Sequence, residues 1–330
     1  MWEKGARLFA KAGLAVVTAV WLAAAAEAQL PPTTSDPARK VERLRELGLG
    51  YADRGRFEEA VNTLEEAVRA APGHAPAYND LGYVYHLSGR YGEAARSYLE
   101  AVRLMDGYAV AWNNLGMAYS ASGDLKSAVW ALRRALRIQP AYAAAFYNLG
   151  MTYYKMGKSM DAAEALKSTV RLDPGFADAY LSLGIIHTEL GSYASAVEAL
   201  NLAAALRPDS PVVYRSIGLA YQKAGRLTDA VAAYRRALDI KRDAEVYNNL
   251  GVAYDLLGRP REAVESYRQA IDLRPNYREA YYNLGMAHLR AGRSDEAFAQ
   301  YAALKRFAPE MAEGLYAQLM RDRVLNAARK

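Results

Sequence analysis

The 330-residue sequence contains no cysteine and only four histidines. The absence of cysteine excludes disulfide bonds, zinc–thiolate centres and cysteine nucleophiles, so the fold must be held by packing. The histidines are scattered along the chain, at His74, His86, His187 and His288, and packed side chains are expected there rather than metal ligands. There is no phosphate-binding glycine loop and no Gly-x-Ser-x-Gly motif. We therefore expect a protein that is not an enzyme and that has no metal site and no cofactor.

Long apolar runs are also scarce, and the one at the N-terminus extends from Ala12 to Ala26. Basic residues precede this run, and Ala26-Glu27-Ala28 matches the small-x-small pattern of a cleavage site. The run is shorter than the roughly 20 residues that cross a bilayer. We predict that residues 1–28 form a signal peptide, with an uncleaved N-terminal membrane anchor as the alternative. The expected location is the bacterial periplasm, or the inner membrane facing the periplasm if the segment is retained.

Residues 29–40 contain three prolines and the sequence Thr-Thr-Ser. This composition is typical of a short flexible linker. We expect a linker between the N-terminal segment and the rest of the chain.

The sequence has no concentration of positive or negative charge that would identify a partner. The net charge is +6, and basic residues on the expected second helices are mixed with acidic ones: Arg133, Arg134, Arg137, Arg235 and Arg236 with Glu65, Glu66, Glu198 and Asp239. Nucleic-acid-binding proteins concentrate basic residues on one face and add a reader module. We interpret these residues as a solvated outer face and expect no nucleic-acid partner.

Glycine, in contrast, recurs with a fixed period. One column lies at intervals of 34 residues, with a single interval of 33, and comprises Gly48, Gly82, Gly116, Gly150, Gly184, Gly218, Gly251 and Gly285. A second glycine follows each of these after seven residues. A period of this length indicates a stacked repeat array, in which each unit contacts its neighbours. The predicted repeats are 41–74, 75–108, 109–142, 143–176, 177–210, 211–243, 244–277 and 278–310.

The residues between the glycines predict two helices in each repeat. Trp112, Leu115 and Tyr119 have helical spacing and form one apolar stripe of a first helix. The second glycine can end this helix and turn the chain, and a proline usually follows the second helix. After Pro309, the residues Met311, Leu315 and Leu319 fall on one helical face. We therefore predict a capping helix over residues 311–330, which would cover the last repeat.

This pattern resembles the tetratricopeptide repeat family, whose motif is reproduced in order by Trp112, Leu115, Gly116, Tyr119, Ala128, Leu132, Ala135 and Pro140. The resemblance covers residues 41–310. It implies an all-α fold, a right-handed superhelical solenoid of helix-turn-helix repeats with the C-terminal capping helix at its end. Departures from the motif occur at Leu44, Asp106, Thr169, His187, His288 and Leu304, and the sixth repeat is one residue short.

The resemblance also implies that first helices line a concave groove. The two positions before the Leu-Gly pair are mostly polar, and the peptide-binding candidates among them are Asn79, Asp80, Asn113, Asn114, Asn148, Asn248, Asn249 and Asn283. An asparagine amide can donate and accept, so it can pair with a peptide backbone without reading its sequence. These positions resemble the asparagine ladder in the repeats of O-linked N-acetylglucosamine transferases. The alternative is that they are solvated or form local hydrogen bonds.

The function predicted from these features is a scaffold that binds an extended peptide segment of a partner in the concave groove. An apolar residue directly follows each leading glycine and could contact partner side chains, although core packing is favoured. One alternative is a structural subunit of an envelope or exopolysaccharide-export assembly that docks through its convex face. Another is an accessory subunit of a neighbouring enzyme. A protein or peptide partner is expected, and a membrane contact only if the N-terminal segment is uncleaved.

Overall fold

The computed structural model describes residues 37–328, and all regular secondary structure in this range is helical. The predicted signal peptide or anchor, residues 1–28, and residues 29–36 of the predicted linker lie outside the described range. The first helix begins at Pro37, so residues 37–40, which were predicted to belong to the linker, are helical instead. Proline suits the first helical position because its fixed φ fits and its missing N–H is not needed there. Within residues 37–328, no helix is both long enough and apolar enough to span a membrane.

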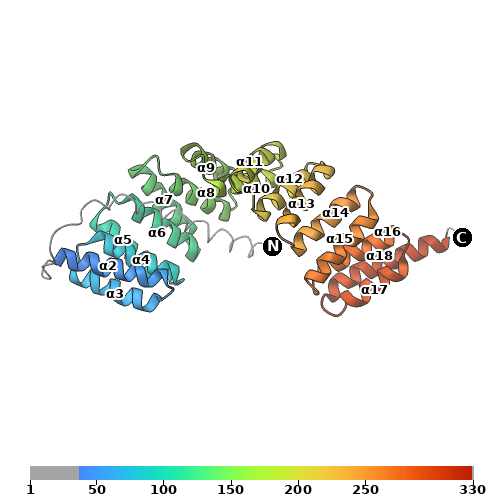
Figure 1. Cartoon of the computed structure of the whole chain (residues 1–330), viewed down its shortest axis with the longest axis horizontal. Coiled ribbons are helices and arrows are strands. Elements are labelled where there is room, and N and C mark those ends of the chain that lie inside the picture. The colour runs from blue at the N-terminus through green and yellow to red at the C-terminus, as the bar shows by residue number, and fades with distance from the viewer. Residues whose placement is uncertain (1–36, 329–330) are drawn as a thin grey trace. The chain divides into compact units, whose positions relative to one another are not determined.

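Two helices form each repeat (Figure 1). The first helices are α2 (Pro37–Asp53), α4 (Ala75–Leu87), α6 (Ala109–Ser122), α8 (Ala143–Lys155), α10 (Ala177–Glu189), α12 (Pro211–Lys223), α14 (Ala244–Leu256) and α16 (Arg278–Arg290). The second helices are α3 (Phe57–Ala70), α5 (Tyr91–Leu104), α7 (Leu125–Ile138), α9 (Ser159–Leu172), α11 (Tyr193–Leu206), α13 (Leu227–Ile240), α15 (Pro260–Leu273) and α17 (Ser294–Leu304). A single helix, α18 (Pro309–Ala328), follows. The all-α repeat solenoid predicted from the sequence is confirmed.

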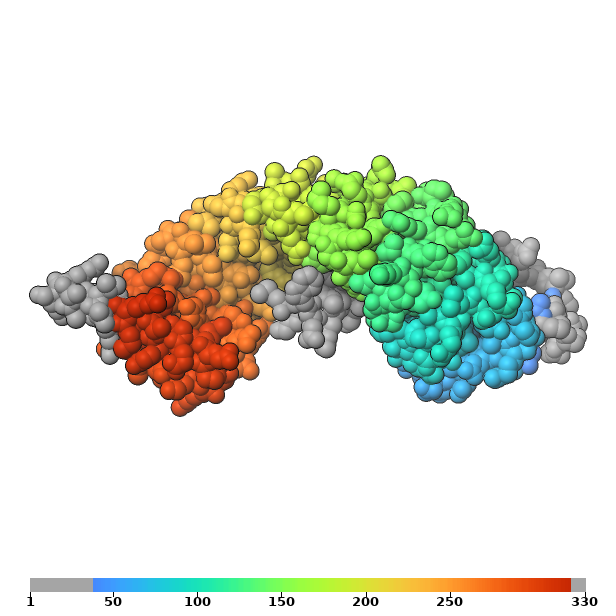
Figure 2. Space-filling model, turned by 180° about the vertical axis from the view of Figure 1, so that it is seen from behind, coloured from blue at the N-terminus to red at the C-terminus, as the bar shows by residue number. Residues whose placement is uncertain are grey.

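The chain divides into two compact units, one ending at Ala179 and the other beginning at Tyr180. In each unit the repeats follow one another in chain order as adjoining bands of colour (Figure 2). In the first unit, successive first helices contact each other directly: α2 with α4, α4 with α6, and α6 with α8. Second helices of successive repeats make no comparable contacts in residues 37–328. The first helices therefore form the closely packed inner layer and the second helices the outer layer.

The leading glycines allow the two helices of a repeat to pack closely. A Cβ atom added at Gly116 would lie 2.5 Å from Cγ of Leu132 and 3.2 Å from the carbonyl oxygen of Ala128. Leu132 is fully buried. The same clash would occur at Gly218, where the ring of Tyr234 lies 2.5 Å from the added atom. A large side chain of the second helix thus occupies the space that only glycine leaves open.

The glycines of the second column end the first helices. Gly123, for example, is the C-cap residue of α6 and has a φ of 90°. Left-handed backbone of this kind favours glycine, because a Cβ atom would approach the neighbouring carbonyl oxygen. The chain therefore reverses direction over two or three residues before the second helix begins.

An arginine reinforces this turn in several repeats. In the second repeat, the guanidinium of Arg90 lies 4.5 Å from the ring centroid of Tyr85, and its Nε–H donates to Glu93 at 3.0 Å. In the sixth repeat, Arg226 stacks on Tyr221 at 4.5 Å in the same way. Cation–π contacts at such partly exposed sites contribute about 0.5–1 kcal/mol each. The contact fixes the end of the first helix to the start of the second.

The second repeat has Asp106 where the motif has proline, and the structure supplies a reason. The carboxylate of Asp106 accepts from Arg134 of α7 at 2.8 and 3.1 Å. The carbonyl oxygen of Asp106 accepts from Nε1 of Trp112 at 2.8 Å. Hydrogen bonds to the next repeat therefore fix this loop in place of a proline ring.

The shorter sixth repeat uses a helix cap instead of proline. Asp243 is the N-cap of α14, and its carboxylate accepts from the backbone N–H groups of Glu245 at 2.8 Å and Val246 at 3.1 Å. An aspartate N-cap satisfies N–H groups that have no partner within the helix. The connection between α13 and α14 can therefore be one residue shorter.

The two ends of the described array differ. Leu47 of α2 is 47% exposed, whereas its counterparts in the seven later repeats, such as Leu115, are buried. At the other end, α18 packs against α16 and α17, and its Leu315 and Leu319 are fully buried. Leu315 lies against Gly285, since a Cβ atom added at Gly285 would lie 2.5 Å from Cδ2 of Leu315. Helix α18 therefore covers the last repeat, while the face of α2 at Leu47 is open.

His288 leads to a prediction about pH. It stands at the tyrosine position of the eighth repeat and is 1% exposed. Burial, and to a smaller degree Arg293, lower the pKa of His288 below its usual 6.5. Since the unfolded state then binds the proton more readily, stability should fall as the pH drops below about 6.5. Urea denaturation at pH 5 and pH 8 should show that His288→Tyr reduces this loss.

A tyrosine at position 288 can also stack with Arg293, as its counterparts do with arginine in other repeats. An unchanged difference in stability between the two pH values in His288→Tyr would contradict the assignment of this pH dependence to His288.

Candidate binding surface of the first helices

The asparagines predicted to bind peptide form a chain of hydrogen bonds between first helices of the first unit. Nδ2 of Asn148 on α8 donates to Oδ1 of Asn113 on α6 at 2.9 Å. Nδ2 of Asn113 donates to Oδ1 of Asn114 at 3.3 Å, and Nδ2 of Asn114 donates to Oδ1 of Asn79 on α4 at 3.0 Å. Two of these three bonds join residues 35 positions apart. The amides therefore link one repeat to the next.

An ion pair takes the same place between the first and second repeats. Nε of Arg45 on α2 donates to Oδ2 of Asp80 on α4 at 2.7 Å, again over 35 positions. Burial raises the pKa of the Asp80 carboxyl, and the charge and hydrogen bond of Arg45 act in the opposite direction. Removing either partner would leave the other charged group poorly solvated.

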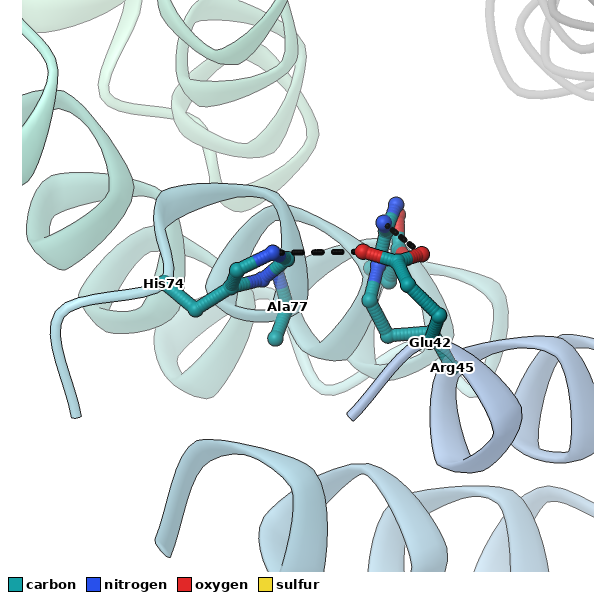
Figure 3. A network of polar contacts seen from close by, with 5 residues as sticks. Glu42, Arg45, His74 and Ala77 are labelled. Carbon is teal, nitrogen blue, oxygen red and sulfur yellow. Dashed lines mark hydrogen bonds and ion pairs between the residues drawn. The ribbon is translucent and has the colours of Figure 1, made fainter. Parts of the chain in front are cut away.

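Arg45 also belongs to a polar network at the start of the array (Figure 3). It donates to Glu42 at 2.7 Å, and the other carboxylate oxygen of Glu42 lies 3.3 Å from Nε2 of His74. Nδ1 of His74 accepts from the backbone N–H of Ala77 at 3.3 Å. His74 thus caps α4 and connects this helix with α2.

A bond of the same kind joins two first helices of the second unit. Nδ2 of Asn283 on α16 donates to Oδ1 of Asn248 on α14 at 3.0 Å. Between α12 and α14 the link is ionic, because Arg215 donates to Glu245 at 3.2 Å. In both units, amides at these positions form hydrogen bonds between successive first helices.

The structure places the predicted site residues in two groups. Asn79, Asp80, Asn113, Asn114 and Asn248 are buried, whereas Asn148, Asn249 and Asn283 are half-buried. Three of the four hydrogen bonds described among these asparagines join neighbouring repeats, which the sequence did not indicate. The half-buried amides keep part of their surface available to a ligand. Peptide binding by these eight residues stays a prediction.

A row of apolar side chains accompanies the amides. Each lies one helical turn after the polar position, and in the first unit the row comprises Leu49, Tyr83, Met117 and Met151, all half-buried. Met117 receives a weak hydrogen bond from Nδ2 of Asn113, with an N–S distance of 3.7 Å, so both side chains lie on the same face of α6. The inner layer therefore presents an apolar row beside a polar one.

Sequence reasoning missed a second set of links at the C-terminal ends of the first helices. Nζ of Lys155 on α8 donates to the carbonyl oxygen and to Oγ of Ser120 on α6, both at 3.1 Å. Desolvation lowers the pKa of Lys155, and the positive charge of Lys155 adds to burial in lowering the pKa of His86. Arg290 pairs with Asp255 in the same way in the second unit. These pairs share the spacing of 35 residues with Arg45 and Asp80, but this spacing identifies a contact only once the stacking of the repeats is known.

The histidines are not gathered into a metal site. Among the described residues, no group of three or more His, Asp or Glu side chains could hold a metal ion. His288 is buried in the core of the eighth repeat, and His74 is a helix cap. The burial of His288 agrees with the packed side chain expected at this position.

Comparison with known proteins identifies the family. The sequence profile described as tetratricopeptide repeat matches residues 45–110, 147–211 and 257–312. A second profile of that description matches residues 213–276, and one described as TPR repeat matches residues 118–157. The chain belongs to the tetratricopeptide repeat family. Among curated protein sequences, none matches the chain.

Solved structures support the same fold. The chain is similar to the crystal structure of the APC/C heterotetramer Cut9–Hcn1, with 20% identity and a TM-score of 0.54 over 86% of this chain and 58% of that one. It thus spans less than two thirds of that relative. A tetratricopeptide repeat protein from Parabacteroides merdae is 19% identical, with a TM-score of 0.54 over 76% of this chain and 99% of that one. YrrB, titled a TPR protein with an unusual peptide-binding site, is 21% identical, with a TM-score of 0.51 over 56% and 96% of the two chains.

Membership of this family assigns the general role. Tetratricopeptide repeat proteins are generally non-catalytic scaffolds for protein–protein interaction, and the implied partner is a protein. A stacked array is suited to this role because its repeats create an extended surface.

Proposed function

We propose that the chain binds an extended segment of a partner protein along the inner layer of first helices. The observation that carries this proposal is the half-buried apolar row of the first unit, Leu49, Tyr83, Met117 and Met151, together with the half-buried Asn148 beside it. Apolar contacts would supply affinity, and amides such as Asn148 would pair with the partner's backbone. Neither contact requires a particular partner sequence.

The dimensions of the array suit an extended chain. Neighbouring first helices pack about 8–10 Å apart, and an extended chain advances about 3.3 Å per residue. One repeat therefore corresponds to about three residues of the partner. Side chains of the partner would meet Tyr83, Met117 and Met151 in turn. YrrB, whose title names a peptide-binding site, offers a precedent on a similar fold.

Site-specific crosslinking in cells tests the proposal. A photoreactive residue at position 117 or 151 should capture a partner through one short segment, and the same residue at position 160 should not. Met160 lies on second helix α9 and is 68% exposed, so it reports on the outer layer. Peptide mapping of the crosslinked product identifies the segment.

Matched substitutions then measure its affinity. Met117→Glu together with Met151→Glu should weaken binding of the captured segment at least tenfold, because the row loses its apolar character. Met160→Glu makes the same chemical change on the outer layer and should leave the affinity unchanged. These variants test binding at the inner layer more cleanly than replacement of Asn114 or Asn148, because those two amides also join neighbouring repeats. Equal binding by all variants would remove the inner layer as the working site.

We also propose that residues 1–28 direct the chain out of the cytoplasm. The basic start, the short apolar run and the Ala-Glu-Ala sequence support this location. The same crosslinked cells provide the test, since the chain should be recovered from the periplasmic fraction without residues 1–28. Recovery of the intact chain from the membrane would favour the anchor, and recovery from the cytoplasm would overturn the proposal.

A further inference from the structure

Helix α7 differs in charge from the other second helices. It carries Lys126, Arg133, Arg134 and Arg137 and no acidic residue, whereas each of the other seven second helices contains at least one. Its neighbours α5 and α9 each carry two basic and two acidic residues. An excess of positive charge in this part of the outer layer is therefore confined to one helix, α7.

Helix α7 has an exposed aromatic side chain at its centre. Trp130 is 54% exposed, which is unusual for a large apolar side chain. It lies one turn after Lys126 and about one turn before Arg133, and all three residues are exposed on one side of α7. Figure 1 shows α7 beside α6 and α8, the two first helices against which it packs.

The buried side chain of Trp112 holds Trp130 in place. Its ring makes an edge contact with Trp112, with the ring centroids 5.0 Å apart. Trp112 is itself fixed by its hydrogen bond to the carbonyl oxygen of Asp106, and Asp106 is bound by Arg134. A side chain fixed before binding loses less conformational entropy when it is covered.

We propose that this stripe, comprising Lys126, Trp130, Arg133 and Arg137 and here called the tryptophan stripe, docks an acidic segment of a partner protein. An apolar side chain of that segment covers Trp130, and carboxylates pair with the basic residues on either side. Tryptophan and arginine are enriched among the residues that dominate interface energies. This site lies on the outer layer and is separate from the proposed groove.

The length of the stripe sets the spacing of the acidic residues. Lys126 and Arg137 are 11 positions apart, which corresponds to about 16 Å along a helix at 1.5 Å per residue. An extended partner covers this distance with about five residues at roughly 3.3 Å each. A helical partner covers it with about three turns of 5.4 Å, with acidic residues on one face.

The width of the stripe favours a single segment over a broad anionic surface. A membrane or a nucleic acid would also meet the acidic residues of α5 and α9, including Glu100 and Glu164. Like-charge contacts of this kind oppose docking. A second copy of the chain could offer acidic helix α3, but Glu59, Glu65 and Glu66 there already pair with basic residues of their own repeat. Charge complementarity therefore indicates an acidic protein segment.

Selection from a library of random 15-residue peptides displayed on phage tests the proposal with the full chain. Enriched peptides should be acidic and contain a large apolar residue. For these peptides, Trp130→Ala and Arg133→Glu should each raise the dissociation constant at least tenfold, measured by fluorescence anisotropy. Binding should also weaken as salt concentration rises, because the attraction is between charges.

The chain offers a matched control. Arg235 of α13 stands at the position equivalent to Arg133, next to Arg236 as Arg133 is next to Arg134, but Ala232 replaces the tryptophan. Arg235→Glu makes the same charge change and should alter the dissociation constant less than twofold. Circular dichroism should show that Arg133→Glu and Arg235→Glu both keep the helical fold. A difference in peptide binding between them then arises from the tryptophan stripe and not from unfolding.

Three results would overturn the proposal. One is the enrichment of peptides without acidic residues, or of acidic peptides that bind Trp130→Ala and Arg133→Glu as well as they bind the wild type. Another is loss of these peptides in Met117→Glu instead, which would place them in the groove. The third is that no peptides are enriched and Trp130→Ala abolishes another kind of binding. Loss of sedimentation with vesicles containing 30% anionic lipid would assign the stripe to a membrane, and loss of self-association would assign it to a second copy of the chain.

Discussion

Replacing Gly116 with alanine should lower the free energy of unfolding by about 1–3 kcal/mol. Alanine is favoured over glycine by about 1 kcal/mol inside a helix, so helix propensity alone predicts the opposite sign. The steric term dominates because the new Cβ would lie 2.5 Å from Cγ of Leu132 and 3.2 Å from the carbonyl oxygen of Ala128. The contact at Leu132 is with its branch point, so rotation of the terminal methyl groups does not relieve it.

Gly50 provides the control for this prediction. It also lies in a first helix, α2, and nothing lies within 4 Å of an added Cβ. Gly50→Ala should therefore raise stability, by up to about 1 kcal/mol. Urea denaturation followed by circular dichroism measures both variants. Stabilisation by Gly116→Ala would show that the close approach of α6 and α7 is not what requires glycine.

A double-mutant cycle isolates the contact. Leu132→Ala alone should cost about 2–5 kcal/mol, because it leaves a cavity in the core. With Leu132 shortened, the Cβ at position 116 meets open space, so Gly116→Ala should cost much less than in the wild type. Additive effects would assign the cost of Gly116→Ala to something other than Leu132.

These glycines show why the architecture could be predicted from the sequence. Each repeat has a glycine in its first helix, a second glycine at the turn and a small residue in its second helix. These residues recur because the two helices pack in the same way in every repeat. Gly116 and Gly123 meet one steric requirement each, and both requirements are local. Local requirements of this kind leave a period in the sequence that a single chain reveals.

The role of the asparagines could not be predicted in the same way. Their position and polarity were evident, but an amide that faces a ligand and an amide that faces its neighbour have the same sequence pattern. The distance between Asn114 and Asn79 depends on how two repeats stack, and a repeat motif does not specify this. The spacing of 35 residues from Arg45 to Asp80 carries the information only once stacking is known.

The tryptophan stripe was hidden for a different reason. Trp130 occupies a position that holds Arg96 in the preceding repeat and Glu164 in the following one, so no repeated column indicates it. The arginines of α7 were interpreted as part of a mixed outer face, which holds for α5 and α9. Exposure of Trp130 and its support by Trp112 became evident only from the packing of the two helices.

Ending the chain at residue 310 should lower the melting temperature and promote association. Helix α18 buries Ala312, Leu315 and Leu319 against the last repeat, and Leu304 of α17 is fully buried in the same cluster. Without α18 these side chains lose their cover, and an uncovered apolar face at the end of a repeat array favours association. Thermal melts by circular dichroism and molar mass by light scattering measure the two effects.

Single substitutions separate the loss of packing from the loss of a helix. Leu315→Ala should cost about 2–5 kcal/mol, because Leu315 is fully buried and fills the space at Gly285. Glu313→Ala changes an exposed residue of the same helix and should have little effect. Because each repeat contacts only its neighbours, Leu315→Ala should destabilise mainly α16 and α17, whose amides should exchange hydrogen faster. The amides of α4 to α6 should keep their resistance to hydrogen exchange. A melt of the shortened chain that matches the full chain would show that the eighth repeat does not depend on its cap.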